Sequence, residues 1–251
     1  MAKLIKRTIT AGPLVMEAIY PAPHPRDSMG VRQGKKALSS AAQQRMNLKY
    51  AYQRLELLIA ANFRRGDLWC TFTYDEDHLP KSRKESIAKM SAFMKRLRAL
   101  RKPNGSELVY IYNTEHKHGD GRWHHHVLLN NVGEAFEAIA QLWGQGLVFI
   151  RPLRVDKQKH VESLARYLCK EFRDGVGDRM WTCSRNLKKP ERDCCRVDEV
   201  EAAVLSAPEG ALIFEDSGQV VTAYGRYRFI KYLDNGWQQA VRPRRARRRA
   251  S

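Results

Sequence analysis

The chain has 251 residues, 43% of them hydrophobic, which is enough apolar material for one large or two small domains with a packed core. Lysine and arginine number 45 against 27 acidic residues, so the formal net charge is +18. This excess favours a polyanionic partner, with nucleic acid as the first candidate. The sequence has no run near the ~20 apolar residues that span a membrane and no signal-peptide core. It therefore predicts an intracellular protein without membrane attachment.

The N-terminal part of the sequence predicts two segments. Residues 1–39 mix proline, glycine, serine and basic residues without a lasting period, which indicates an irregular arm. Residues 40–65 contain few breakers, and Met46, Tyr50 and Leu55 belong to a rough apolar stripe interleaved with basic side chains. This pattern predicts a basic amphipathic helix.

The middle of the chain alternates strand and helix patterns. The predicted elements are a strand at 68–74, a helix from Ser82 to about 100, strands at 108–115 and 123–130, a helix at 135–143, a strand at 146–153 and a helix at 160–172. Ser82 and Glu85 form a capping-box pattern, and Gly144 ends the next helix. This order predicts an α+β fold, a ferredoxin-like split βαβ arrangement in which an antiparallel sheet has its helices on one face.

The C-terminal part of the sequence is more irregular. Residues 174–198 are rich in lysine and arginine and predict a loop, and residues 191–241 predict an α+β extension. Within that extension we expect a short helix after residue 198 and strands at 211–214 and 224–232. The tail, 242–251, has six arginines between positions 242 and 249, which indicates a disordered end that clamps phosphate groups or is merely solvated.

Five of the eight histidines lie between positions 116 and 126, in the predicted hairpin. A two-residue turn at Asp120-Gly121 would place Glu115 opposite His126, and side chains two apart on a strand share a face. Glu115, His124 and His126 then converge on one face, while His125 points to the other. Two imidazoles and one carboxylate on a rigid face suit a catalytic divalent metal ion. The alternative is an exposed basic hairpin whose histidines contact only solvent or phosphate.

Tyr167 lies on the predicted helix 160–172, about 120° away from the middle of its apolar stripe. Lys170, three residues later, is its neighbour on the helix surface and could lower the pKa of the phenol or neutralise a phosphate. A tyrosine held in this way can act as a nucleophile. The alternative is a boundary tyrosine that packs by its ring.

Together these patterns resemble the His-hydrophobe-His (HUH) endonucleases, and within them the rolling-circle replication initiators of small phages and plasmids. The resemblance rests on LWCTFTYDEDHLP (68–80), on Glu115 with GRWHHH (121–126), and on ARYLCKEF (165–172). WTCSRNLKKP (181–190) is similar to a segment that follows the third motif in phage-type members, so the expected HUH domain spans 66–190. His125 stands where the family has a hydrophobic residue and is an alternative ligand, and Glu171 in place of a second tyrosine resembles the single-tyrosine class.

The resemblance implies a metal-dependent endonuclease that nicks and rejoins single-stranded or hairpin origin DNA. Tyr167 would form a 5′-phosphotyrosine bond, assisted by Lys170, while Glu115, His124 and His126 would hold Mg²⁺ or Mn²⁺. The residues expected to contact DNA are Thr71, Thr73, Arg122, Arg166, Arg185, Lys188, Lys189, Arg244, Arg245, Arg247 and Arg248. The expected location is the cytoplasm of a bacterial or phage-infected host cell.

The sequence contains no Walker A motif, so a host helicase and a polymerase are expected partners. Three alternatives remain open at this stage. The same chemistry could serve transposition or plasmid mobilisation, a metal-dependent nuclease could use water in place of tyrosine, or the chain could be a non-catalytic nucleic-acid-binding protein. The sequence does not indicate an oligomeric state.

Overall fold

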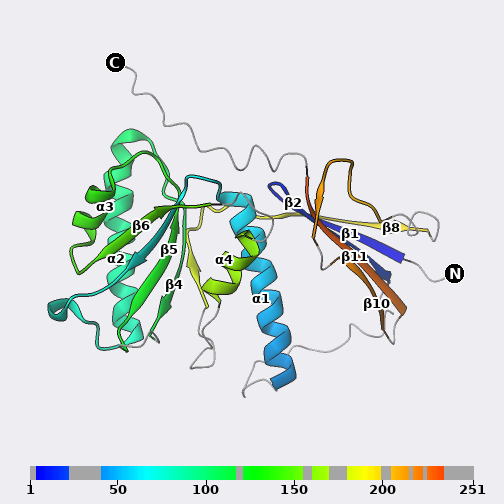
Figure 1. Cartoon of the computed structure of the whole chain (residues 1–251), viewed down its shortest axis with the longest axis horizontal. Coiled ribbons are helices and arrows are strands. Elements are labelled where there is room, and N and C mark those ends of the chain that lie inside the picture. The colour runs from blue at the N-terminus through cyan, green and yellow to red at the C-terminus, as the bar shows by residue number, and fades with distance from the viewer. Residues whose placement is uncertain are drawn as a thin grey trace. The chain divides into compact units, whose positions relative to one another are not determined.

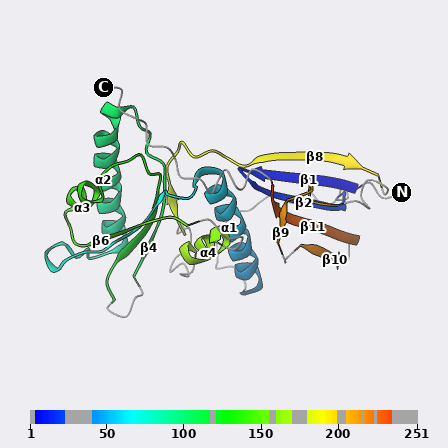
Figure 2. The same cartoon turned by 45° about the horizontal axis from the view of Figure 1, so that its top comes forward.

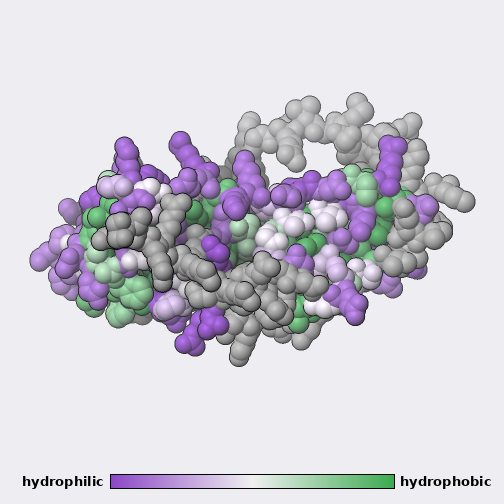
Figure 3. All heavy atoms as spheres, turned by 90° about the horizontal axis from the view of Figure 1, so that it is seen from above, coloured by the Kyte–Doolittle hydropathy of each residue, from purple (hydrophilic) through white to green (hydrophobic). Residues whose placement is uncertain are grey.

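A computed structural model describes residues 4–22, 41–116, 121–154, 160–169, 180–198, 205–214, 217–222 and 225–234. Of these, the residues in 4–61 and 188–234 form one compact unit, unit 1, and those in 62–187 form another, unit 2. Residues 199–204, where the sequence predicts the start of a short helix, and the tail 242–251 lie outside the described residues. Among the described helices, none is long and apolar enough to cross a membrane. On the face seen in Figure 3, hydrophilic residues occupy most of the coloured surface.

Unit 2 contains a five-stranded antiparallel sheet with the strand order β6-β3-β5-β4-β7. Its strands are β3 (Leu68–Phe72), β4 (Tyr110–Glu115), β5 (His124–Leu129), β6 (Val148–Pro152) and β7 (Thr182–Cys183). Its helices are α2 (Arg83–Arg101), α3 (Phe136–Trp143) and α4 (His160–Leu168), with short 3₁₀ turns η2 (Glu76–His78) and η3 (Lys102–Asn104). The α+β class is therefore correct, and each element predicted between residues 68 and 168 is present.

The helices of unit 2 occupy both faces of the sheet (Figure 1). Helices α2 and α3 cover one face, where the core side chains include Phe72, Phe93 and Trp143. Helix α4 lies on the other face, because its Tyr167 contacts Trp69, a residue that points away from that core. The expectation that the helices share one face is therefore wrong for α4. The apolar stripes predict that a helix packs, but they do not specify on which face of the sheet.

Local signals fix the ends of these helices. The Ser82 side chain accepts a hydrogen bond from the Glu85 amide at the start of α2. The Glu85 carboxylate accepts from the Lys81 amide, so the box closes one residue earlier than expected. Gly144 ends α3 with a φ of +60°, a conformation that glycine adopts without steric cost.

Unit 1 contains a second antiparallel sheet with the order β10-β11-β2-β1-β8, in which β9 also pairs with β11 (Figure 2). Its strands are β1 (Leu4–Ala11), β2 (Leu14–Pro21), β8 (Glu191–Val197), β9 (Leu212–Ile213), β10 (Gly218–Thr222) and β11 (Gly225–Leu233), and its helix is α1 (Ala41–Asn62). The predicted helix in 40–65 is confirmed. Of its apolar stripe, Leu55 is buried, whereas Met46 and Tyr50 are exposed.

Two expectations for the ends of the chain are wrong. Residues 4–21 form the β1–β2 hairpin and not an irregular arm, and β7 and β8 lie within 174–198, where a loop was expected. Strand β10 was not predicted. The reason is long-range pairing: β1 pairs with β8, and β2 pairs with β11, so partners far apart in the sequence supply the hydrogen bonds and buried neighbours.

Helix α1 packs on one face of this sheet. Lys231 of β11 and Glu56 of α1 form a buried ion pair of 2.6 Å. At the β1–β2 turn, Gly12 approaches the helix so closely that a Cβ atom would lie 2.7 Å from the Ala60 carbonyl oxygen. With a φ of +59° as well, this position strongly favours glycine.

Candidate functional site

The β4–β5 hairpin brings an acidic residue beside the histidines. Glu115 pairs with His124, and Asn113 pairs with His126. The predicted register, with Glu115 opposite His126, is wrong by two residues, because residues 116–123 separate the two strands. A slip of two residues preserves the face on which each side chain lies, since side chains alternate with a period of two. Glu115, His124 and His126 therefore do share one face of the sheet.

His126 is at the centre of the polar contacts on this face. It is 5% exposed, and its Nε2 atom lies 3.4 Å from Glu115 Oε2. Its Nδ1 atom lies 3.1 Å from the Thr71 hydroxyl oxygen on the neighbouring strand β3. Glu115 is fully buried and accepts a 2.7 Å hydrogen bond from the Asn113 side-chain amide. The imidazole and the carboxylate are thus both held in place by neighbouring strand residues.

Tyr167 of α4 reaches the same group. Its hydroxyl oxygen lies 3.1 Å from His126 Nε2, and the two rings pack edge to face with centroids 4.9 Å apart. Trp69 of β3 stacks on His126 at 5.7 Å and meets the Tyr167 ring at 5.6 Å. The structure therefore brings together the predicted nucleophile and two of the predicted metal ligands. Lys170 lies outside the described residues.

The electrostatic surroundings of Tyr167 keep its phenol protonated. Burial raises the pKa of Tyr167, and the nearby Glu115 carboxylate raises it further. Arg151 of β6 acts in the opposite direction and lowers this pKa. Arg151 is the cation that the structure places near the phenol.

The donor atoms on this face fit a divalent metal ion in chemical type. His124 Nδ1 lies 2.9 Å from the Arg122 carbonyl oxygen, which can only accept, so the proton is on Nδ1 and the lone pair on Nε2. A hydrogen bond donated from His126 Nδ1 to Thr71 gives the same tautomer. Metal-binding histidines commonly donate their second ring N–H in this way. Among the described residues, however, no three acidic, histidine or cysteine side chains are grouped closely enough to enclose an ion; the contact is the pair Glu115 and His126.

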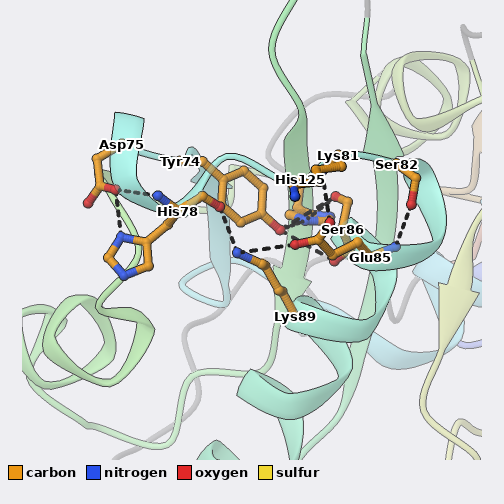
Figure 4. A network of polar contacts seen from close by, with 9 residues as sticks. All are labelled: Tyr74, Asp75, His78, Lys81, Ser82, Glu85, Ser86, Lys89 and His125. Atoms are coloured by element: carbon orange, nitrogen blue, oxygen red, sulfur yellow. Dashed lines mark hydrogen bonds and ion pairs between the residues drawn. The ribbon is translucent and has the colours of Figure 1, made fainter.

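His125 lies on the opposite face, within the core (Figure 4). Its Nε2 atom is 2.7 Å from the Tyr74 hydroxyl and 3.1 Å from the Ser86 hydroxyl, and its Nδ1 atom is 3.0 Å from the Thr114 hydroxyl. Complete burial lowers the pKa of His125 to about 3, and the neighbouring histidines add to this effect. The alternative of His125 as the ligand in place of His124 is therefore wrong in this structure. His125 is a neutral core residue.

The predicted DNA-contacting residues divide into three groups. Thr71 supports His126, and the Thr73 hydroxyl exchanges hydrogen bonds with the backbone of Leu147, so both hydroxyls have contacts within the protein. Arg122 pairs with Glu76, and Arg166 pairs with Glu162. The residues with exposed side chains are Arg185, Lys188 and Lys189. The arginines of the tail, Arg244, Arg245, Arg247 and Arg248, lie outside the described residues.

Sequence reasoning missed three residues on this face. Trp69 stacks on His126, Arg151 pairs with Trp69 across β3 and β6, and Phe149 pairs with Thr71. Phe149 is 61% exposed, which is unusual for a phenylalanine beside a polar site. The signal was present in the alternation of β6, because Phe149 and Arg151 are two residues apart and so share a face. Which face that is depends on the pairing with β3.

Residues 67–174 match the model of a family of replication-associated proteins described by the name ORF2. The resemblance to replication proteins of the small phage and plasmid type is thus confirmed over this segment, which contains Glu115, His124, His126 and Tyr167. The match indicates a role in DNA replication for unit 2. No curated protein and no solved structure matches the chain.

Proposed function

We propose that unit 2 is an HUH-type endonuclease that initiates rolling-circle replication by nicking and rejoining single-stranded DNA. The observation that carries the proposal is the 3.1 Å approach of the Tyr167 hydroxyl to His126, on the face that also holds Glu115. The strand order β6-β3-β5-β4, with crossovers through α2 and α3, supports a ferredoxin-like sheet as the scaffold. The family match over 67–174 supports the replication role.

In the proposed reaction, the Tyr167 oxygen attacks the scissile phosphorus, and the bond from phosphorus to the 3′-oxygen breaks. The products are a 5′-phosphotyrosine and a free 3′-hydroxyl, so the phenolic proton balances the proton gained by the departing oxygen and no water is consumed. The phosphodiester is conserved in the covalent bond, and the reverse reaction rejoins the ends. Lys170 and Arg151 are the cations that would offset phosphate charge.

Glu115, His124 and His126 are the residues that would hold Mg²⁺ or Mn²⁺. Such an ion polarises the scissile phosphate and stabilises its developing charge. The chain's own contribution is to fix the donors: Asn113 orients Glu115, Thr71 orients His126, and the Arg122 carbonyl sets the tautomer of His124.

The test is a nicking assay on single strands that tile the replicon encoding this chain, including its hairpin-forming segments. With Mn²⁺ or Mg²⁺, a 3′-labelled oligonucleotide should migrate with the protein on a denaturing gel, and the 5′-labelled fragment should be extendable by a polymerase. EDTA should abolish both products. Cleavage without an adduct would indicate a nuclease that uses water, and binding without cleavage would indicate a non-catalytic protein. An adduct formed only at mobilisation or transposon-end sites would assign the same chemistry to transfer in place of replication.

A further inference from the structure

The unit 1 sheet presents aromatic and arginine side chains at one end of the face that α1 covers at the other end. Along this face, Arg7 of β1 pairs with Ala18 of β2, which pairs with Phe229 of β11. Tyr20 and Tyr227 lie two residues beyond Ala18 and Phe229 respectively, and therefore point to the same side. Side chains on one pleated face form a continuous surface.

The three aromatic rings of this region form a row. The rings of Tyr20 and Tyr227 are stacked with centroids 6.0 Å apart, and the rings of Tyr227 and Phe229 are 5.8 Å apart. The Arg7 guanidinium lies over the Tyr20 ring, 5.7 Å from its centroid. All three rings keep part of their surface exposed to solvent. Large aromatic side chains that only supported the sheet would be expected in its core, as Trp143 is in unit 2.

Charge separates the two faces of this sheet. Arg192 and Arg196 of the edge strand β8 lie on the same face as Arg7 and are exposed. Among the strand positions that the structure describes in unit 1, the acidic residues all lie on the opposite face; these are Glu17, Glu191 and Asp193. The row of aromatic rings is therefore bordered by arginines that share their face with no acidic residue of these strands. Its natural complement is an anion with flat apolar groups.

The other end of the same face differs in both respects. Met16 is buried and receives a hydrogen bond from Gln53 of α1, and the charge of Lys231 is neutralised by Glu56 of α1. That end of the face is used for packing against the helix. The aromatic and arginine residues begin where these helix contacts stop.

We propose that this region, the aromatic–arginine face (Arg7, Tyr20, Tyr227, Phe229, Arg192 and Arg196), binds single-stranded nucleic acid. Bases stack on the rings of Tyr20, Tyr227 and Phe229, and phosphates contact the arginines. Stacking needs bases that are out of a duplex, so the face selects single strands. This site is separate from the residues proposed for nicking, and it would hold the strand without taking part in the chemistry.

The test uses the full chain in EDTA, so that binding is measured without cleavage and does not depend on the proposed nicking activity. The probes are fluorescently labelled dT12, rU12 and a 12-base-pair duplex, followed by anisotropy at several salt concentrations. Tyr227→Ala should weaken dT12 binding about tenfold, because one stacking platform is lost. Arg7→Gln should lower the slope of log affinity against log salt by about 0.7, the value for one phosphate contact on a single strand.

Arg226→Gln is the matched control, since Arg226 is exposed on the opposite face of the same strand β11 as Tyr227. It removes the same charge as Arg7→Gln and should change neither the affinity for dT12 nor the salt slope by more than the error. Thermal unfolding checks that the three variants are folded. Photocross-linking with an oligonucleotide that carries 5-iodouracil should then map to Tyr20, Tyr227 or Phe229.

Two outcomes would overturn the proposal: equal losses for Arg7→Gln and Arg226→Gln, or a folded Tyr227→Ala protein that binds dT12 as tightly as the wild type. Equal affinity for the duplex would also overturn it, since it would indicate a purely electrostatic contact. The dT12 and rU12 arms distinguish DNA from RNA as the bound strand. Loss of nicking with retained dT12 binding would count against the proposed endonuclease alone.

Discussion

Both units of this protein are built on an antiparallel sheet with one face packed against helix, but the chain constructs the two sheets differently. The sheet of unit 2 comes from one continuous segment, and neighbouring strands such as β4 and β5 are joined by a short connection. In the sheet of unit 1, β1 and β8 are paired although Lys6 and Cys195 are 189 positions apart.

The second face of each sheet also differs. In unit 2 it carries buried polar groups, Glu115 and His126, beneath Tyr167, whereas in unit 1 it carries partly exposed rings and arginines. Buried polar groups that are held in a network suit chemistry, because their geometry is fixed before a substrate arrives. Exposed rings with surrounding charge suit binding. The comparison suggests a division of labour that mutations can test.

The largest expected effect concerns Tyr167. Tyr167→Phe keeps the ring contacts with Trp69 and His126 but removes the attacking oxygen, so nicking and adduct formation should fall to background while the fold is retained. Denaturing gels measure the adduct, and circular dichroism measures the fold. Adduct formation by this variant would transfer the role to another tyrosine and would remove the assignment of chemistry to this face.

The next test separates adjacent histidines on β5. His126→Ala should abolish metal-dependent nicking, with a smaller effect on stability. His125→Gln should lower the free energy of unfolding by about 2–3 kcal/mol, because it disrupts the hydrogen bonds with Tyr74, Ser86 and Thr114. Urea titrations and nicking rates per folded molecule give the two readings. The opposite pattern would show that the two faces of β5 are wrongly assigned.

The third test concerns the ion pair that joins α1 to the sheet in unit 1. Lys231→Met leaves the buried Glu56 carboxylate without its cation and should cost about 3–5 kcal/mol of stability. The double variant Lys231→Met with Glu56→Leu should recover most of this loss, because neither charge is then left buried. Chemical denaturation monitored by two probes measures both variants. A small loss in the single variant would indicate that α1 is held mainly by apolar contacts.

His125 also gives unit 2 a pH dependence. Because its pKa falls from 6.5 to about 3 on folding, the unfolded chain binds a proton between these values and the folded chain does not. Stability is therefore highest above pH 6.5 and falls as the pH drops towards 3, by at most about 1.4 kcal/mol per pH unit from this group. The difference in slope between wild type and His125→Gln isolates this contribution. Parallel slopes would contradict the neutral, buried state of the imidazole.

The smallest effect is expected from Phe149, which lies next to the candidate site and is 61% exposed. If its ring stacks on a base of the substrate, Phe149→Ala should weaken binding of the nicked strand by about tenfold and leave the rate at saturation almost unchanged. The readout is the KM of nicking against kcat. Leu147→Ala, another exposed apolar residue just before the same strand, is the control.

The lessons for sequence interpretation follow from the same comparison. In unit 2, each element predicted between 68 and 168 is present because its signals are local: a serine cap at Ser82, a glycine stop at Gly144, and apolar residues at helical or alternating spacing. The face of Glu115, His124 and His126 was also predictable, since a register error of two residues leaves the alternation intact.

The sequence by itself thus determined the α+β class, the elements of unit 2 and the residues of the candidate site. Only the tertiary structure decided that α4 lies on the face opposite α2 and α3, that Arg151 rather than a described lysine is near Tyr167, and that residues 4–21 are strands. These features depend on partners distant in sequence. A strand such as β1 acquires its hydrogen bonds and its buried neighbours only when β2 and β8 are beside it, and no local pattern encodes that pairing.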